Sequence, residues 1–274
     1  MACRVLKVSR SGYNDWRGRP QSPREQRNGE LVKLIREIHE TSRYSYGSPR
    51  VHAELTLGLD LPVNRKRVER LMREAGIQGI YRRKGHRNLV NAATEEDLVR
   101  RAFIVEAPDR LWVSDITEHP TGEGKLYCAA VMDAYSRRII GHSIDIRQTS
   151  TLVVDAMVMA VARRNPPSKK TILHSDHGTQ YTSFAYGKRL RDAELLGSMG
   201  TVGDCYDNAM MESFWGTMQI ELLDINKWQT RAELAAAMFE WIECWYNPYR
   251  RHSSIGMNSP IAFEELYKPP HATA

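Results

Sequence analysis

The chain has 274 residues, of which 42% are hydrophobic and 26% charged, a size and composition that suit one large or two modest globular domains. Residues 1–90 carry 20 Lys and Arg against 9 Asp and Glu, a net charge of +11, whereas the remainder carries 19 against 24, a net charge of −5. No apolar run approaches the ~18 residues that span a bilayer, and no signal-peptide core is visible, so we expect a cytoplasmic protein. The charge asymmetry indicates a polyanion-binding segment joined to a second domain, with a solvated basic surface as the alternative.

The front of the chain predicts an arm followed by helices. Residues 1–24 are rich in Arg, Ser, Gly and Pro and predict an extended or partly ordered basic arm. From Leu31 to Ile38, apolar residues recur at helical spacing, which predicts a helix over 25–41. Ser48, followed by proline, is typical of the start of a short second helix.

A basic amphipathic helix follows at residues 64–76. It combines an apolar stripe with a basic face and ends at Gly76, a natural C-terminal cap. Two helices, a turn and a basic helix predict a helix-turn-helix-like DNA-binding domain over 25–90, although small trihelical units also serve as scaffolds. The expected DNA contacts are Arg65, Lys66, Arg67, Arg70, Arg73, Arg82, Arg83, Lys84 and Arg87.

After a predicted linker at 91–109, the pattern changes to alternating strands and helices. The sequence predicts strands at 111–117, on either side of a turn within 125–144, and at 171–175, with helices at 150–164, 183–195, about 204–223 and 231–246. A hairpin comes first, so this order predicts a mixed α/β fold rather than a doubly wound sheet.

Three acidic residues adjoin these elements. Asp115 closes the first strand, Asp176 follows the strand at 171–175, and Glu212 lies 36 positions further on, with 35 residues between. Phosphodiester cleavage needs an activated water or hydroxyl and a stabilised leaving oxygen, and two Mg²⁺ ions held by a few carboxylates provide both. Turn-closing or helix-capping aspartates are the alternative. Other acids compete for the same role: Asp133, Asp155, Asp204 and Asp207.

Longer blocks occur around these acids in a fixed order. They are Trp112–Thr117 (WVSDIT), Asp133–Gly141 (DAYSRRIIG), His174–Ser183 (HSDHGTQYTS), Gly203–Trp215 (GDCYDNAMMESFW) and Tyr246–Phe263 (YNPYRRHSSIGMNSPIAF). Together with SRSGYNDW and YGSPRVHAEL in the front segment, they resemble the insertion-sequence transposases with a retroviral-integrase-type core. More narrowly, they resemble the second-frame catalytic product of the insertion-sequence-three family. The resemblance covers nearly the whole chain.

The resemblance implies a ribonuclease-H-like integrase core, an α/β fold with a mixed five-stranded sheet flanked by helices, at residues 110–225. A C-terminal helix and a basic-aromatic tail at 226–274 complete it. Asp115, Asp176 and Glu212 become the catalytic triad and the ligands of two Mg²⁺ ions, with Mn²⁺ as a substitute. The implied chemistry is 3′-end cleavage by water, after which the freed 3′-hydroxyl attacks a second phosphodiester in strand transfer.

Further residues are expected to support the triad. We expect His174 to orient a carboxylate or a backbone group, and His177 to approach DNA. Gly178 is expected to permit a tight turn that brings the loop close to substrate. Asn208 is expected to hold Glu212 or bind a phosphate, with simple helix capping as the alternative.

One residue departs from the pattern that the resemblance implies. Family members often carry Lys or Arg seven residues after the glutamate, where this chain has Gln219. An amide can hydrogen-bond DNA but supplies no charge, which puts that contact in doubt but not the metal site. In the tail, Arg250 and Arg251 are expected to track phosphates, and the tryptophans of the preceding helix are expected in the core.

The resemblance also implies partners. These are DNA, both as terminal inverted repeats and as target, further copies of the chain in a homo-oligomer on DNA, and an upstream-frame product fused by frameshifting. Nucleoid association would follow from DNA binding. Two other functions stay open: a ribonuclease-H-like nuclease that only hydrolyses, and a DNA-binding regulator whose core has lost catalysis. Zinc binding by the histidines around Asp176 is disfavoured because the four cysteines are far apart and form no CxxC pair.

Overall fold

The computed structural model describes residues 5, 8–80, 105–176, 178–199 and 209–268, and the chain divides into two compact units, Met1–Ile80 and Tyr81–Ala274. Among the helices in these residues, none combines the length and hydropathy that crossing a bilayer requires. Several residues singled out from the sequence lie outside the described part: Arg82, Arg83, Lys84, Arg87, His177, Asp204, Asp207 and Asn208.

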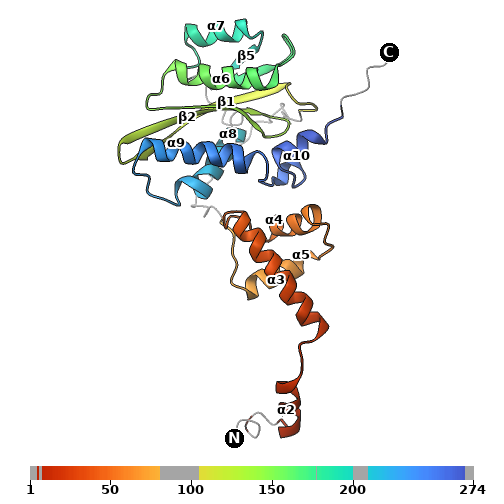
Figure 1. The fold of residues 1–274 in the computed structure, drawn as a ribbon. Helices are drawn as coiled ribbons and strands as arrows, with labels where there is room; N and C mark the ends of the chain where they lie inside the picture. The colour runs from red at the N-terminus through yellow and green to blue at the C-terminus, as the bar shows by residue number, and fades with distance from the viewer. Residues whose placement is uncertain (1–4, 6–7, 81–104, 177, 200–208, 269–274) are drawn as a thin grey trace, which may run out of the picture. The chain divides into compact units, whose positions relative to one another are not determined.

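The first unit is helical throughout its described elements (Figure 1). They are α2 (Arg10–Gly18), α3 (Pro23–Thr41), α4 (Ser48–Ala53) continuing as the π-helix η1 (Glu54–Gly58), and α5 (Arg65–Glu74). Helices α3, α4 and α5 pack on one another and bury one apolar core, so the predicted helix-turn-helix-like domain is confirmed. Its buried side chains include Leu31, Ile35, Ile38, Val51, Leu55, Val68, Leu71 and Met72.

Local signals set the ends of these helices. At the start of α3, Ser22 accepts the Glu25 N–H and Glu25 accepts the Ser22 N–H, a reciprocal capping box. Beyond α5, Gly76 takes φ +68° as predicted for the residue that ends this helix.

Of the two alternatives predicted for the arm, extended or partly ordered, the extended one is wrong for residues 10–18, which form α2. Ser9 caps this helix by accepting the Gly12 N–H at 3.0 Å. Tyr13 and Trp16, three residues apart, bring their rings to 6.0 Å and support the helix locally.

The second unit is built on a five-stranded mixed sheet in the order β3-β2-β1-β4-β5. The strands are β1 (Leu111–Thr121), β2 (Gly124–Asp133), β3 (Ile139–Asp145), β4 (Ile172–Ser175) and β5 (Leu196–Met199). β2 pairs antiparallel with both β1 and β3, whereas β4 pairs parallel with β1 and with β5. The α/β fold expected from the resemblance is therefore confirmed.

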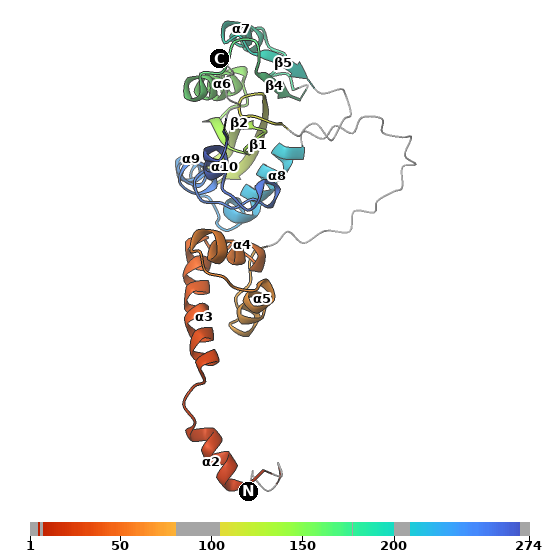
Figure 2. The same cartoon turned by 90° about the vertical axis from the view of Figure 1, so that its right-hand side faces the viewer.

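Helices cover both faces of the sheet (Figures 1 and 2). α6 (Ser150–Arg164) and α7 (Phe184–Asp192) cover one face, and α8 (Ala209–Met218) and α9 (Arg231–Glu240) lie against the other. Gly141 sets the spacing on the α6 side, because a Cβ there would lie 2.1 Å from the Ala156 carbonyl oxygen. The core between the sheet and α6 is therefore closely packed around a backbone contact.

The C-terminal elements are the π-helix η3 (Trp241–Tyr246), the 3-10 helix η4 (Ser253–Ile255) and α10 (Pro260–Glu265). Trp241 and Trp245 are buried, as expected. The expected phosphate contact of Arg250 is wrong: its guanidinium is buried and donates to both carboxylate oxygens of Glu221, at 2.8 and 2.9 Å. A buried arginine already held by a carboxylate has no side-chain surface to offer to DNA.

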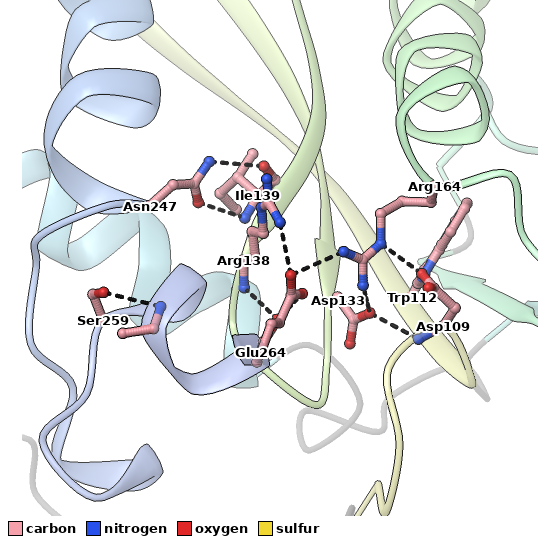
Figure 3. A network of polar contacts seen from close by, with 11 residues as sticks. Asp109, Trp112, Asp133, Arg138, Ile139, Arg164, Asn247, Ser259 and Glu264 are labelled. Carbon is pink, nitrogen blue, oxygen red and sulfur yellow. Dashed lines mark hydrogen bonds and ion pairs between the residues drawn. The ribbon is translucent and has the colours of Figure 1, made fainter. Parts of the chain in front are cut away.

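Arg164, at the end of α6, is the centre of a polar network between segments distant in sequence (Figure 3). It donates to Asp109 at 2.8 Å, Asp133 at 3.0 Å and Glu264 at 2.9 Å. Arg138 also donates to Glu264, at 2.7 Å. Asp109, expected at the end of the linker, is thus held by hydrogen bonds within the second unit.

Asp133 is fully buried within this network. Burial raises the pKa of its carboxyl to about 6, against the backbone N–H groups of Asp109 and Tyr135 and the charge of Arg164, which lower it. Its carboxylate accepts the Tyr135 N–H at 2.8 Å, so Asp133 stabilises the turn between β2 and β3 and has a structural role.

We expect Arg164→Gln to lower the free energy of unfolding of the second unit by about 3–5 kcal/mol, because it leaves the buried Asp133 carboxylate without its cation. The pKa of Asp133 should rise above its value in the unmodified chain, since the lowering effect of the guanidinium is lost. Urea unfolding and carboxyl-carbon NMR titration measure the two effects. The exposed Arg147→Gln serves as the control, with a change within ~0.5 kcal/mol; an equally small change for Arg164→Gln would contradict the prediction.

Candidate active site

Asp115 and Asp176 are neighbours across the parallel pair β1–β4. The register pairs Ser114 with Ser175, and each aspartate is the next residue along its chain. Adjacent strands lie about 4.7–4.9 Å apart. Backbone pairing alone therefore brings these two carboxylate-bearing positions together.

The two aspartates lie on the face of the sheet opposite α6 and α7. Trp112 belongs to the core under those helices, and Ser114 is hydrogen-bonded on the same side, so Asp115 points to the other face by strand alternation. The parallel register places His174 on the face of Asp115. Asp176 follows two residues later.

Helix α8 brings Glu212 to this face. The indole N–H of Trp215 donates to Asp115 Oδ2 at 3.0 Å, so the helix is in direct contact with the first aspartate. Residues three apart are neighbours on a helix surface, which puts Glu212 on the side of α8 that reaches Asp115. Glu212 is exposed, whereas the apolar side chains of Met211, Phe214 and Met218 on the same helix are buried.

The loop after Asp176 is anchored at two points. The Gly178 N–H donates to Asp176 Oδ1 at 2.9 Å, and the Gly178 carbonyl accepts the Tyr181 N–H at 2.9 Å. The buried Tyr181 hydroxyl lies 3.1 Å from the Ser114 hydroxyl on β1. These contacts hold the loop, and with it Asp176, against the central strand.

Gly178 lies against the carboxylate of Asp176. A Cβ at this position would lie 3.0 Å from Asp176 Oδ1 and 3.1 Å from Gln180 Oε1. A side chain here would therefore require the Asp176 carboxylate or the Gln180 amide to shift by a few tenths of an ångström.

Two expected supporting residues have contacts that the sequence did not predict. The Nδ1 atom of His174 lies 3.1 Å from the Ser198 hydroxyl on β5. Gln219 begins the π-helix η2 (Gln219–Leu223) and donates its amide to the Asp224 carboxylate. Its hydrogen-bonding capacity is thus used in part within its own segment.

The donor chemistry of the three acids suits a magnesium ion, which prefers carboxylate oxygens. Within the described residues, no three His, Cys, Asp or Glu side chains lie close enough together to hold a metal ion as they stand. Of the rival acids, Asp133 is paired with Arg164, and Asp155 is exposed on α6, the helix that covers the other face. The site is therefore a pair of adjacent aspartates with a glutamate on a neighbouring helix face.

Neither the role of Trp215 nor the contact between Tyr181 and Ser114 was predicted from the sequence. The tryptophan lies in the block GDCYDNAMMESFW, three residues after the glutamate, and this i,i+3 spacing was the one available signal. The tyrosine contact joins residues 67 positions apart, which no local pattern reveals.

Comparisons with known proteins agree with the fold and the organisation of the chain. Models of the integrase core domain match residues 105–205 and 196–260, and an HTH-like domain model matches residues 25–85. An uncharacterized 31 kDa protein of insertion element IS600 from Shigella sonnei is 37% identical over 97% of this chain and 98% of its own length. The transposase InsF for insertion sequence IS3A from Escherichia coli K12 is 38% identical over 96% of this chain and 92% of its own length.

Among solved structures, a chain of the simian T-cell lymphotropic virus intasome, in complex with a PP2A regulatory subunit, aligns with a TM-score of 0.48 at 16% identity. The alignment covers 61% of this chain and 59% of that chain.

The integrase core and the HTH-like domain define a polynucleotidyl transferase of the transposase and integrase class. The relatives from insertion elements match nearly the whole chain at 37% and 38% identity. The chain therefore belongs to the family of insertion-sequence DDE transposases.

We expect Trp215→Phe to lower the rate of DNA strand cleavage about tenfold or more, because the phenyl ring keeps the packing but removes the hydrogen bond that joins α8 to Asp115. A labelled-oligonucleotide cleavage assay measures the rate. Trp228→Phe is the matched control, since that indole donates to the Leu223 carbonyl instead. Equal rates for the two variants would show that the bond to Asp115 has no part in catalysis.

Proposed function

We propose that Asp115, Asp176 and Glu212 are the catalytic triad of this transposase and hold its divalent metal. The proposal includes Mg²⁺-dependent cleavage at the 3′ ends of the element followed by strand transfer, with two ions per site and Mn²⁺ as a substitute. The observation that carries it is the parallel register of β1 and β4, which makes Asp115 and Asp176 neighbours on the face that α8 touches.

The proposed reaction has two displacements. In the first, water attacks a phosphodiester at the element's end, one P–O bond breaks, and a 3′-hydroxyl and a 5′-phosphate result. In the second, that hydroxyl attacks a target phosphodiester, so one P–O bond forms as another breaks. Bound Mg²⁺ supplies the charge that stabilises the attacking and leaving oxygens.

The chain's own groups would prepare this site for its ligands. The Trp215 N–H and the Gly178 N–H each donate to one oxygen of an aspartate, which restrains the orientation of that carboxylate. The Tyr181 contact with β1 keeps the loop of Asp176 in place. Glu212 projects from α8 as an exposed side chain and supplies the third carboxylate.

The proposal extends to partners. The basic helix α5 would bind the DNA of the terminal inverted repeats, and the catalytic unit would bind target DNA, with Arg251 and the basic tract after the first unit as further contacts. A homo-oligomer would hold two element ends together, and an upstream-frame product would be joined by frameshifting. In support, α5 has a basic exposed side through Arg65, Lys66 and Arg73.

Removing any one triad carboxylate tests the assignment. We expect Asp115→Asn, Asp176→Asn and Glu212→Gln each to reduce Mg²⁺-dependent cleavage by at least about a hundredfold, because each removes a charged metal ligand. DNA binding, measured by fluorescence anisotropy without divalent metal, should survive. Asp155→Asn is the control: Asp155 is exposed on α6, and its replacement should leave cleavage unchanged. Near-normal cleavage by the Asp176→Asn protein would show that Asp176 is not part of the catalytic site.

Joined products separate transposition from plain hydrolysis. We expect a pre-cut element end with a free 3′-hydroxyl to become linked to target DNA in the presence of Mg²⁺, visible as longer labelled strands on a denaturing gel. Hydrolysed strands without joined product would favour the nuclease, and stable binding with neither product would favour the catalytically silent regulator.

A further inference from the structure

A basic groove lies within the first unit, formed by the starts of two helices. It has a volume of about 560 Å³ and is lined by Arg24 and Arg27 of α3 and by Lys66, Arg67 and Arg70 of α5. A water molecule occupies about 30 Å³ of liquid, so the groove is much larger than one small anion requires. All five lining residues are cations.

Few of these charges are compensated by the protein. In the part of the chain that the structure describes, one of the five forms an ion pair, Arg70 with Glu74 at 3.3 Å. Arg67 donates through Nε and Nη2 to the neutral amide oxygen of Asn28, at 3.1 and 2.8 Å. Arg27 donates through Nε to the Pro23 carbonyl at 3.2 Å. These bonds hold two guanidinium groups in place without neutralising them.

Helix geometry adds to the positive potential. Arg24 lies in the first turn of α3, and Lys66 and Arg67 lie in the first turn of α5, where the helix dipole is positive. Lys66 and Arg70 are four residues apart on α5, a spacing at which like charges repel. A groove lined in this way carries a positive potential that attracts an anion.

We propose that this groove seats consecutive phosphate groups of one DNA strand, with Arg24 and Arg27 of α3 as phosphate contacts beside the basic face of α5. This rests on the proposed function, since DNA is the substrate. Because the groove is formed by two helices, it fixes the angle at which the DNA backbone crosses the first unit. The groove therefore positions the DNA and does not read its base sequence.

The test compares two charge-matched double variants of the full chain. Arg24→Gln with Arg27→Gln removes two cations from the groove, and Lys33→Gln with Arg36→Gln removes two exposed cations further along α3, outside it. Duplex DNA binding is measured by anisotropy over a salt series without divalent metal. We expect the groove variant to reduce the slope of log affinity against log salt by about 1.8, the value for two phosphate contacts. Its affinity at low salt should fall about tenfold, and the control should leave both unchanged.

Two further measurements support the test: binding to duplexes of unrelated sequence, and circular dichroism of both variants. The loss should be the same for duplexes of unrelated sequence, because phosphates carry no base information. Circular dichroism should show both variants folded. Equal weakening by the two variants, or an unchanged salt slope for the groove variant, would overturn the proposal.

Inorganic phosphate serves as the probe for a small-ion site. If it binds the unmodified chain and not the groove variant while the DNA salt slope stays unchanged, the groove is an ion site only and the proposal fails. Failure of the triad assignment is separate, because it would appear as cleavage by the Asp176→Asn protein and would leave these binding measurements untouched.

Discussion

The Arg164 guanidinium joins parts of the second unit that are far apart in the sequence. It reaches Asp109 before β1, Asp133 at the end of β2 and Glu264 on α10. A partly buried cation of this kind stabilises a fold only when its hydrogen bonds are complete, since its desolvation is costly. The network therefore ties the beginning of β1 to α6 and α10, and β1 is the strand on which the candidate site is built.

From that strand the site follows by backbone geometry. Parallel pairing with β4 makes Asp176 a neighbour of Asp115, and no side-chain contact is needed to bring the two together. Glu212 depends instead on the packing of α8, which reaches β1 through Trp215. Two carboxylates are thus fixed by main-chain hydrogen bonds and the third by a helix position, which divides the site into a rigid and a more adjustable part.

Much of the fold and of the candidate site could be predicted from the sequence, because the patterns that indicate them are local. Periodicity placed α3, α5 and α6, and the hairpin of β2 and β3, while the family blocks selected Asp115, Asp176 and Glu212 from 33 acids. Other features escaped for physical reasons. β5 has the sequence LGSM, which lacks the apolar run that marks the equally short β4. The burial of Arg250 depends on Glu221, 29 residues away in the sequence. Arg24 and Arg27 line a groove only because α3 packs beside α5, which no local pattern shows.

The hydrogen bond between Trp215 and Asp115 couples the fluorescence of this indole to the state of the carboxylate. An indole whose N–H is held by a carboxylate changes its emission when the charge or solvation of that carboxylate changes. Trp241 is fully enclosed, so its emission should respond little to events at the surface. The Trp112 indole N–H donates to Asp109, which is not an acid of the candidate triad. The chain therefore contains an intrinsic optical probe, three residues from the glutamate of the candidate triad, that can report on the occupancy of its centre without a label.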